Sequence, residues 1–124
     1  MEIEWDEGAV QRKLCQPSPE EIKALVVALD GTDRSLVMVF RDGAHMAVGG
    51  SAVTGLVLYA TFDNRTFWQL VGDSNHGGVV GVMAGGQLGE YRARYLVDVV
   101  KALAAVTRFT HDGALAPDMV WEES

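Results

Sequence analysis

Hydrophobic residues recur with helical spacing in two stretches of the chain, separated by segments that alternate like β-strands. The first stripe follows a helix-start signature, in which Ser18 can cap the helix and Glu21 can complete a capping box. Its apolar residues share one helical face: Ile22, Leu25, Val26 and Leu29. The second stripe comprises Leu96, Val99, Val100, Leu103 and Val106, with Asp98 in the first turn of its helix, where the helix dipole favours an acid, and the helix should end near Thr110. We therefore predict one helix before the strand-like segments and one after them.

The segments between these helices have the turn chemistry of antiparallel strands. An Asp-Gly pair at residues 42–43 favours a two-residue hairpin turn, and polar residues 63–65 favour a second turn. The predicted strands are residues 36–40, 45–48, 56–62, 66–71, 79–83 and 88–96, with a short final strand at 119–121. This order predicts a single α+β domain over residues 1–124, an antiparallel β-meander packed against an N-terminal and a C-terminal helix.

The charge balance is acidic and restricts the classes of partner. Seventeen Asp and Glu residues face ten Lys and Arg residues, which gives a net charge of −7. Nucleic-acid binders neutralise phosphates with clustered cations, so we expect no nucleic-acid partner and favour a basic protein instead. The acids gather at residues 2–7 and 118–123, where we expect solvated, flexible ends.

Targeting and membrane signals are not expected from this composition. The acidic start is the opposite of the cationic start of a signal peptide. No stretch approaches the roughly 18 uninterrupted apolar residues of a membrane helix. We therefore expect a cytoplasmic protein without membrane contact.

The polar residues form no recognised catalytic or metal-binding pattern. Cys15 has no neighbouring base, and the histidines, of which His45 is expected to be a half-exposed sheet residue, lie far apart. The best alternative is the loop that holds Asp73 and His76, because it joins an acid, a hydroxyl, an amide and an imidazole. We expect a protein that is not an enzyme and has no cofactor or metal. A small ligand-binding protein or enzyme using that loop remains the alternative.

The C-terminal third combines a helix, a turn and a strand that carries a tryptophan. The helix contains Ala104-Ala105-Val106 and ends at Arg108-Phe109; Gly113, Pro117 and Val120-Trp121-Glu122 follow. This pattern resembles the deaminase-associated immunity proteins of bacterial polymorphic toxin systems. The resemblance implies a small α+β protein that binds a cognate toxin, often a nucleic-acid deaminase, and blocks its active site. Phe109, Gly113, Pro117 and Trp121 would then be structural, with Phe109 and Trp121 as core anchors.

The partner contacts are expected in the polar loops that connect the strands. A toxin that processes nucleic acid presents cations around its cleft, so its inhibitor should offer acids and amides there. A rigid sheet beneath these groups would limit the ordering entropy lost on docking. The residues that meet both conditions are Asp63, Asn64, Asp73, Asn75, His76 and Glu90. The sequence leaves open the identity of the toxin and whether the protein is a monomer or a dimer.

Overall fold

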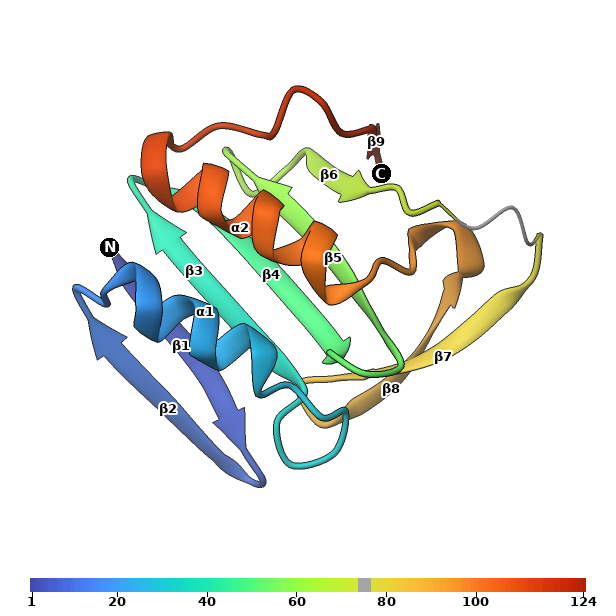
Figure 1. Ribbon diagram of the computed structural model, residues 1–124, viewed down its shortest axis with the longest axis horizontal. Helices are drawn as coiled ribbons and strands as arrows, with labels where there is room; N and C mark the ends of the chain where they lie inside the picture. The colour runs from blue at the N-terminus through green and yellow to red at the C-terminus, as the bar shows by residue number, and fades with distance from the viewer. Residues whose placement is uncertain (74–76) are drawn as a thin grey trace.

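Two helices cover one face of a seven-stranded antiparallel sheet in the computed structural model, which describes residues 1–73 and 77–124 (Figure 1). The helices are α1 (Pro19–Val27) and α2 (Val99–Asp112). The sheet has the order β2-β1-β3-β4-β5-β6-β9. Its strands are β1 (Glu2–Glu7), β2 (Val10–Cys15), β3 (Leu36–Arg41), β4 (Ala44–Ser51), β5 (Gly55–Thr61), β6 (Phe67–Leu70) and β9 (Trp121–Glu123). The predicted α+β class with two packed helices is confirmed.

Both helices begin at side-chain caps: Ser18 caps α1 as predicted, and Asp98, expected within the first turn of the second helix, instead caps α2. The Ser18 hydroxyl accepts a hydrogen bond from the Glu21 amide at 3.1 Å, and the Glu21 carboxylate accepts one from the Ser18 amide at 2.9 Å. Asp98 caps α2 by accepting from the Lys101 amide at 2.8 Å. Gly113, with φ of +74°, ends α2 in a left-handed conformation that glycine adopts without steric cost.

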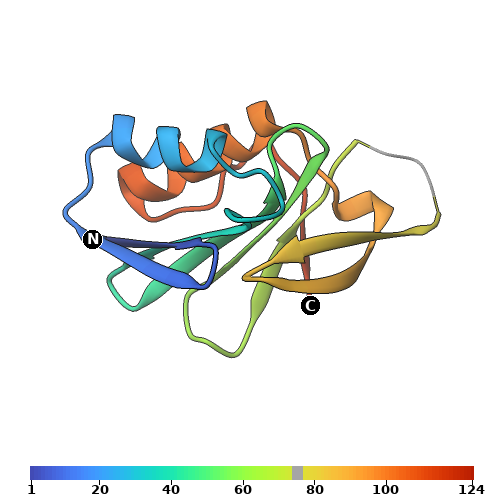
Figure 2. The same ribbon diagram turned by 90° about the horizontal axis from the view of Figure 1, so that it is seen from below.

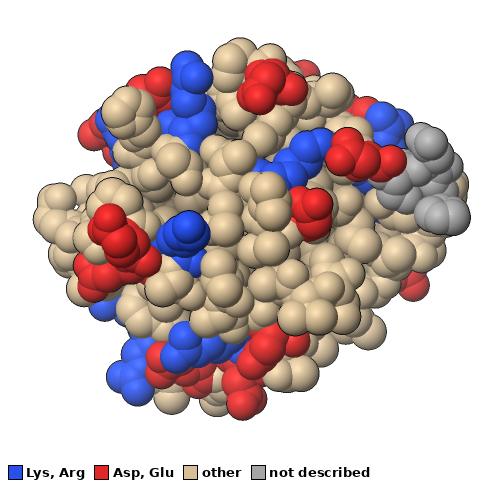
Figure 3. Space-filling view, in the orientation of Figure 1, with Lys and Arg blue, Asp and Glu red and all other residues tan. Residues whose placement is uncertain are grey.

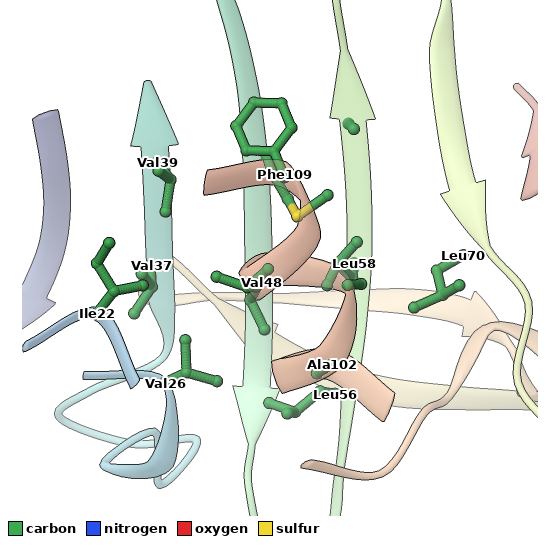
Figure 4. Close-up of a cluster of buried hydrophobic side chains, with 14 of the residues drawn as sticks. Ile22, Val26, Val37, Val39, Val48, Leu56, Leu58, Leu70, Ala102 and Phe109 are labelled. Atoms are coloured by element: carbon green, nitrogen blue, oxygen red, sulfur yellow. The ribbon is translucent and has the colours of Figure 1, made fainter. Parts of the chain in front are cut away.

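The hydrophobic core lies between these two helices and the sheet (Figure 4). Ile22 and Val26 of α1 and Ala102 and Phe109 of α2 point toward the strands, and Phe109 is fully buried. The strand residues that meet them are also buried and come from alternate positions: Val37, Val39, Val48, Leu56, Leu58 and Leu70. The alternation confirms that one face of each of these strands serves the core.

The acidic N-terminal segment is an interior strand, and our expectation of a flexible, solvated end at residues 2–7 is wrong. β1 pairs with β2 on one side and with β3 on the other. Ile3 and Trp5 alternate with the acids and face the core, and Ile3 is fully buried. Asp6 is itself buried. The alternation of apolar and acidic residues outweighs the acidic composition because each strand face has its own environment.

Strands β7 (Val79–Ala84) and β8 (Gln87–Arg92) form a separate hairpin on the side of the sheet opposite the helices (Figure 2). β8 ends at Arg92, four residues before the end of the predicted strand 88–96, because the chain forms a short 3-10 helix at Ala93–Tyr95. The predicted strand at 45–48 instead continues to Ser51, and the final strand begins at Trp121. The meander thus ends at β6, and the chain leaves the main sheet until β9.

Two glycines at the end of β4 allow this hairpin to lie directly against the sheet. A Cβ atom on Gly49 would come within 2.7 Å of the Ala84 Cβ atom. A Cβ atom on Gly50 would come within 2.9 Å of Val82 Cγ1. The tip of the hairpin is held by a hydrogen bond from the Gly86 amide to the Ser35 hydroxyl, at 3.0 Å.

Candidate protein-interaction surface

The structure does not gather the predicted contact residues into one site. Asp63 and Asn64 lie in the turn between β5 and β6, whereas Asp73 follows the other end of β6. Glu90 lies on β8, opposite Gly81. Asn75 and His76 lie outside the described residues. The described positions are therefore dispersed: Asp63 and Asn64 share one turn, whereas Asp73 precedes the β7–β8 hairpin in the chain and Glu90 lies on it.

Asp63 organises its own turn. Its carboxylate accepts hydrogen bonds from the Thr66 and Arg65 amides, both at 2.8 Å. These bonds, with that of Thr66 foremost, lower the pKa of Asp63 below its ordinary value. Asn64 has φ of +60°, a conformation that asparagine tolerates better than most residues. The turn chemistry thus accounts for both residue types.

Asp73 connects the loop after β6 to α2. Its carboxylate lies 3.1 Å from the Lys101 ammonium group, which also lies 3.4 Å from the Val71 carbonyl oxygen. The Asp73 side chain is exposed, so the ion pair is screened by water and contributes little to stability.

The β7–β8 hairpin presents apolar side chains to solvent. Leu88 is 71% exposed and Val79 is 64% exposed, and both lie on the face that points away from the sheet. Val82, on the opposite face of the hairpin, is buried against the sheet. Large apolar side chains that are exposed on a small protein commonly mark an interaction site when they occur together.

A hollow of about 410 Å3 lies beside β7 and continues this apolar surface. Its walls are β7 with Leu88 on one side, and the β4–β5 turn with Leu96 on the other. Val53, at the tip of that turn, is 92% exposed. Among the described residues that line the hollow, Asp30 is the only charged one. Figure 3 shows mixed charges over the helices and a mostly uncharged area at the lower right, over the β4–β5 turn.

A row of aromatic rings crosses the sheet face that the helices leave uncovered. The ring centroids of Phe40 and His45 lie 5.4 Å apart, those of His45 and Tyr59 5.6 Å, and those of Tyr59 and Phe67 5.4 Å. His45 Nε2 lies 3.1 Å from the Tyr59 hydroxyl oxygen. Burial lowers the pKa of His45 and raises that of Tyr59. His45 is a half-buried member of this row, as predicted for a sheet residue.

The four residues of the C-terminal pattern have structural surroundings that differ in burial. Phe109 belongs to the core, Gly113 ends α2, and Pro117 is exposed. Trp121 is half-buried, pairs with Leu70, and donates from Nε1 to the Ala116 carbonyl oxygen at 3.1 Å. Trp121 therefore fixes β9 at the edge of the sheet rather than filling the centre of the core.

The potential metal ligands are dispersed over residues 1–73 and 77–124. Within these ranges, no three His, Cys, Asp or Glu side chains lie close enough together to hold a metal ion. Cys15 is exposed, with its sulfur 3.7 Å from a Glu2 carboxylate oxygen. No helix in this part of the chain is long and apolar enough to cross a membrane.

The chain matches no protein-family model, and no curated protein matches it. Sequence reasoning missed the hollow because its walls come from distant segments. The sequence signals for it are the glycine pairs at residues 49–50 and 85–86, which permit the close crossing and the tight turn of the hairpin.

Proposed function

We propose that this protein is an immunity protein that binds a basic bacterial toxin, with a nucleic-acid deaminase as the favoured class, and covers its active site. The observation that carries the proposal is the β7–β8 hairpin, where Leu88 and Val79 are exposed and Leu88 lines a hollow that Leu96 and Asp30 also line. Apolar contact area surrounded by polar groups is typical of a surface that binds another protein. The C-terminal pattern that resembles immunity proteins supplies the class of partner.

Binding accounts for the arrangement of acids better than catalysis does. Asp30, Asp63 and Asp98 each accept a hydrogen bond from a backbone amide of their own turn or helix start, and Asp6 accepts one from the Ser35 amide just before β3. Carboxylates that accept from backbone amides in this way position the chain. The net charge of −7 would then accelerate association with a basic toxin, and the rate would fall as salt rises.

The test is to express this protein in bacterial cells together with the product of the gene next to its own, and to measure whether the toxicity of that product is lost. Binding between the two purified proteins is then measured. The informative variant is Leu88→Ser, which removes an exposed apolar contact. Val10→Ser is the matched control, because Val10 is 50% exposed on β2, away from the hairpin. Burying a leucine contributes about 1.5–3 kcal/mol, so Leu88→Ser should weaken binding about 10- to 100-fold with an unchanged melting temperature.

A second comparison separates acids that only attract the partner from acids that also stabilise the fold. Glu90→Lys and Asp73→Lys should slow association and leave stability nearly unchanged, since both side chains are exposed. Asp63→Lys should also lower stability, because its turn loses the carboxylate that accepts two amides. Equal binding by the Leu88→Ser and Val10→Ser proteins would exclude the hairpin as the contact. A substrate turnover that disappears in an Asp73→Ala/His76→Ala protein would favour the enzyme alternative.

A further inference from the structure

The outer edge of β7 has backbone groups that β8 does not engage. The hairpin turns through Gly85 and Gly86, both with positive φ, and Ala84 pairs with Gln87 across this two-residue turn. A two-residue turn is closed by a hydrogen-bonded pair, and hydrogen-bonded and non-bonded pairs alternate along an antiparallel ladder. The N–H and C=O groups of Gly81 and Met83 therefore point away from β8.

This free edge borders the hollow. Gly81 and Met83 both line it, and in the described part of the chain neither has a backbone hydrogen bond to a segment outside the hairpin. Gly81 carries no side chain, so another backbone can approach this strand closely. A strand edge with open donors and acceptors beside a hollow has the geometry for the addition of an extended segment.

The walls of the hollow define the side chains that such a segment should carry. Leu88 and Leu96 provide apolar surface on its two sides. Asp30 provides a carboxylate, and hydrogen bonds from the Thr32 amide and then the Arg34 amide lower its pKa, so that it is ionised at neutral pH. An extended segment that alternates apolar residues with Lys or Arg would match both features.

We propose that the hollow beside β7, called the groove from here on, binds an extended basic segment of the toxin, which adds as a third strand to the β7–β8 hairpin. The identity of this partner rests on the proposed function, whereas the mode of binding rests on the free edge and the groove. Apolar side chains of the segment lie against Leu88 and Leu96, and a basic side chain lies near Asp30.

The edge of β2 lacks this complementarity. β2 pairs only with β1 among the described strands, but it carries Arg12 and Lys13. Charged residues, and lysine in particular, protect sheet edges against pairing. Arg12 and Lys13 are ion-paired with Glu7 and Glu2, so they offer no unpaired carboxylate to a basic segment, and β2 serves as an internal comparison for the edge of β7.

The experiment uses the full-length protein and three synthetic hexapeptides with blocked ends. The first is Lys-Val-Arg-Val-Lys-Val, the second replaces every basic residue with glutamate, and the third is the basic peptide with methylated backbone nitrogens. Amide hydrogen exchange and chemical shifts are measured by NMR at millimolar peptide. The basic peptide should slow exchange at Gly81 and Met83 about tenfold, and the other two peptides should have little effect.

Two charge-neutralising variants test the assigned carboxylate. Asp30→Asn keeps an oxygen that can accept from the Thr32 and Arg34 amides but removes the charge in the groove. Asp33→Asn removes the same charge from an exposed residue that does not line the groove. Only Asp30→Asn should weaken binding of the basic peptide, and raised salt should abolish this difference.

Several results would overturn the proposal. The first is that the basic peptide slows hydrogen exchange at the β2 amides and not at those of β7. The second is that the acidic peptide slows exchange at the β7 amides as much as the basic peptide does, and the third is that millimolar basic peptide slows no exchange. Concentration-dependent protection without peptide would assign the groove to a second copy of this chain. The peptides do not involve the toxin, so failure here leaves toxin neutralisation standing. Peptide binding without neutralisation would retain the groove and reject the immunity function.

Discussion

Replacing Asp6 with alanine should destabilise the protein strongly, although Asp6 belongs to an acidic segment. Asp6 is 6% exposed. It accepts hydrogen bonds from the Ser35 amide at 2.7 Å, the Ser35 hydroxyl at 2.6 Å and the Leu36 amide at 2.9 Å. In the Asp6→Ala protein the hydroxyl can rotate to another acceptor, but the two amides are fixed by β3 and its preceding turn.

The expected loss follows from these two amides. A buried donor left without an acceptor costs about 1–3 kcal/mol; the Ser35 amide is buried and the Leu36 amide is part-buried, so the free energy of unfolding should fall by about 2–4 kcal/mol. Asp6→Asn keeps one carbonyl oxygen as an acceptor and should lose less than Asp6→Ala. Glu4→Ala is the matched control, because Glu4 is a half-exposed acid on the same face of β1; its loss should stay within about 0.5 kcal/mol.

The assay is urea unfolding followed by tryptophan fluorescence for all four proteins. Hydrogen exchange at Gly86 supplies a second measurement, since the Ser35 hydroxyl holds the hairpin tip and is itself oriented by Asp6. This amide should exchange faster in Asp6→Ala than in Glu4→Ala when urea is added to the Glu4→Ala protein until the two proteins have the same free energy of unfolding. A loss for Asp6→Ala as small as that for Glu4→Ala would refute the view that this carboxylate satisfies buried donors.

Three further predictions concern the hairpin, the core and a histidine. Gly49→Ala should detach β7–β8 without unfolding the sheet, seen as faster exchange confined to the hairpin; unchanged exchange there would contradict the close-contact argument. Phe109→Ala should lower the free energy of unfolding by about 3–5 kcal/mol. Trp121→Ala should lower it by less, since Trp121 is half-buried at an edge, and equal losses would reverse that ranking. Burial lowers the pKa of His45 in the folded protein below its ordinary value of 6.5, so as the pH falls the histidine is protonated first in the unfolded chain. The stability that the neutral histidine allows should therefore be fully present above pH 6.5 and should be lost as the pH falls through the pKa of His45 in the folded protein. The wild-type melting temperature should therefore fall relative to His45→Gln below pH 6.5, and an NMR midpoint for His45 at or above 6.5 would contradict this.

The helices and most strands could be predicted because their signals are local. Ser18 and Asp98 cap the helices directly, and the Asp-Gly pair at residues 42–43 forms the turn between β3 and β4. β1 and β2 are not among the predicted strands, because the local excess of charge in β1 favours a solvated end although Ile3 and Trp5 alternate with its acids. Alternation is the better guide, since a strand carries two faces with different surroundings.

The interaction surface could be predicted only in part. Polar turn residues such as Asp63 are visible in the sequence, but whether they hold a turn or face a partner depends on contacts that the fold creates. The groove joins β7 to Leu96 and the β4–β5 turn, and no local pattern encodes that meeting. The departure of the hairpin from the main sheet depends on Gly49 and Gly50, whose role is apparent only when a second strand crosses them.

The late position of β9 in the chain has a consequence for synthesis on the ribosome. β9 pairs with β6, but β7, β8 and α2 are made between them, so the edge of β6 stays uncovered until the last strand emerges. An uncovered edge can pair with another nascent chain and lead to aggregation. Once docked, β9 is held by a hydrogen bond from the Tyr95 hydroxyl to Glu122 at 2.7 Å. The finished sheet then ends in a three-residue strand that carries Glu122 and Glu123, and this short acidic margin discourages further pairing.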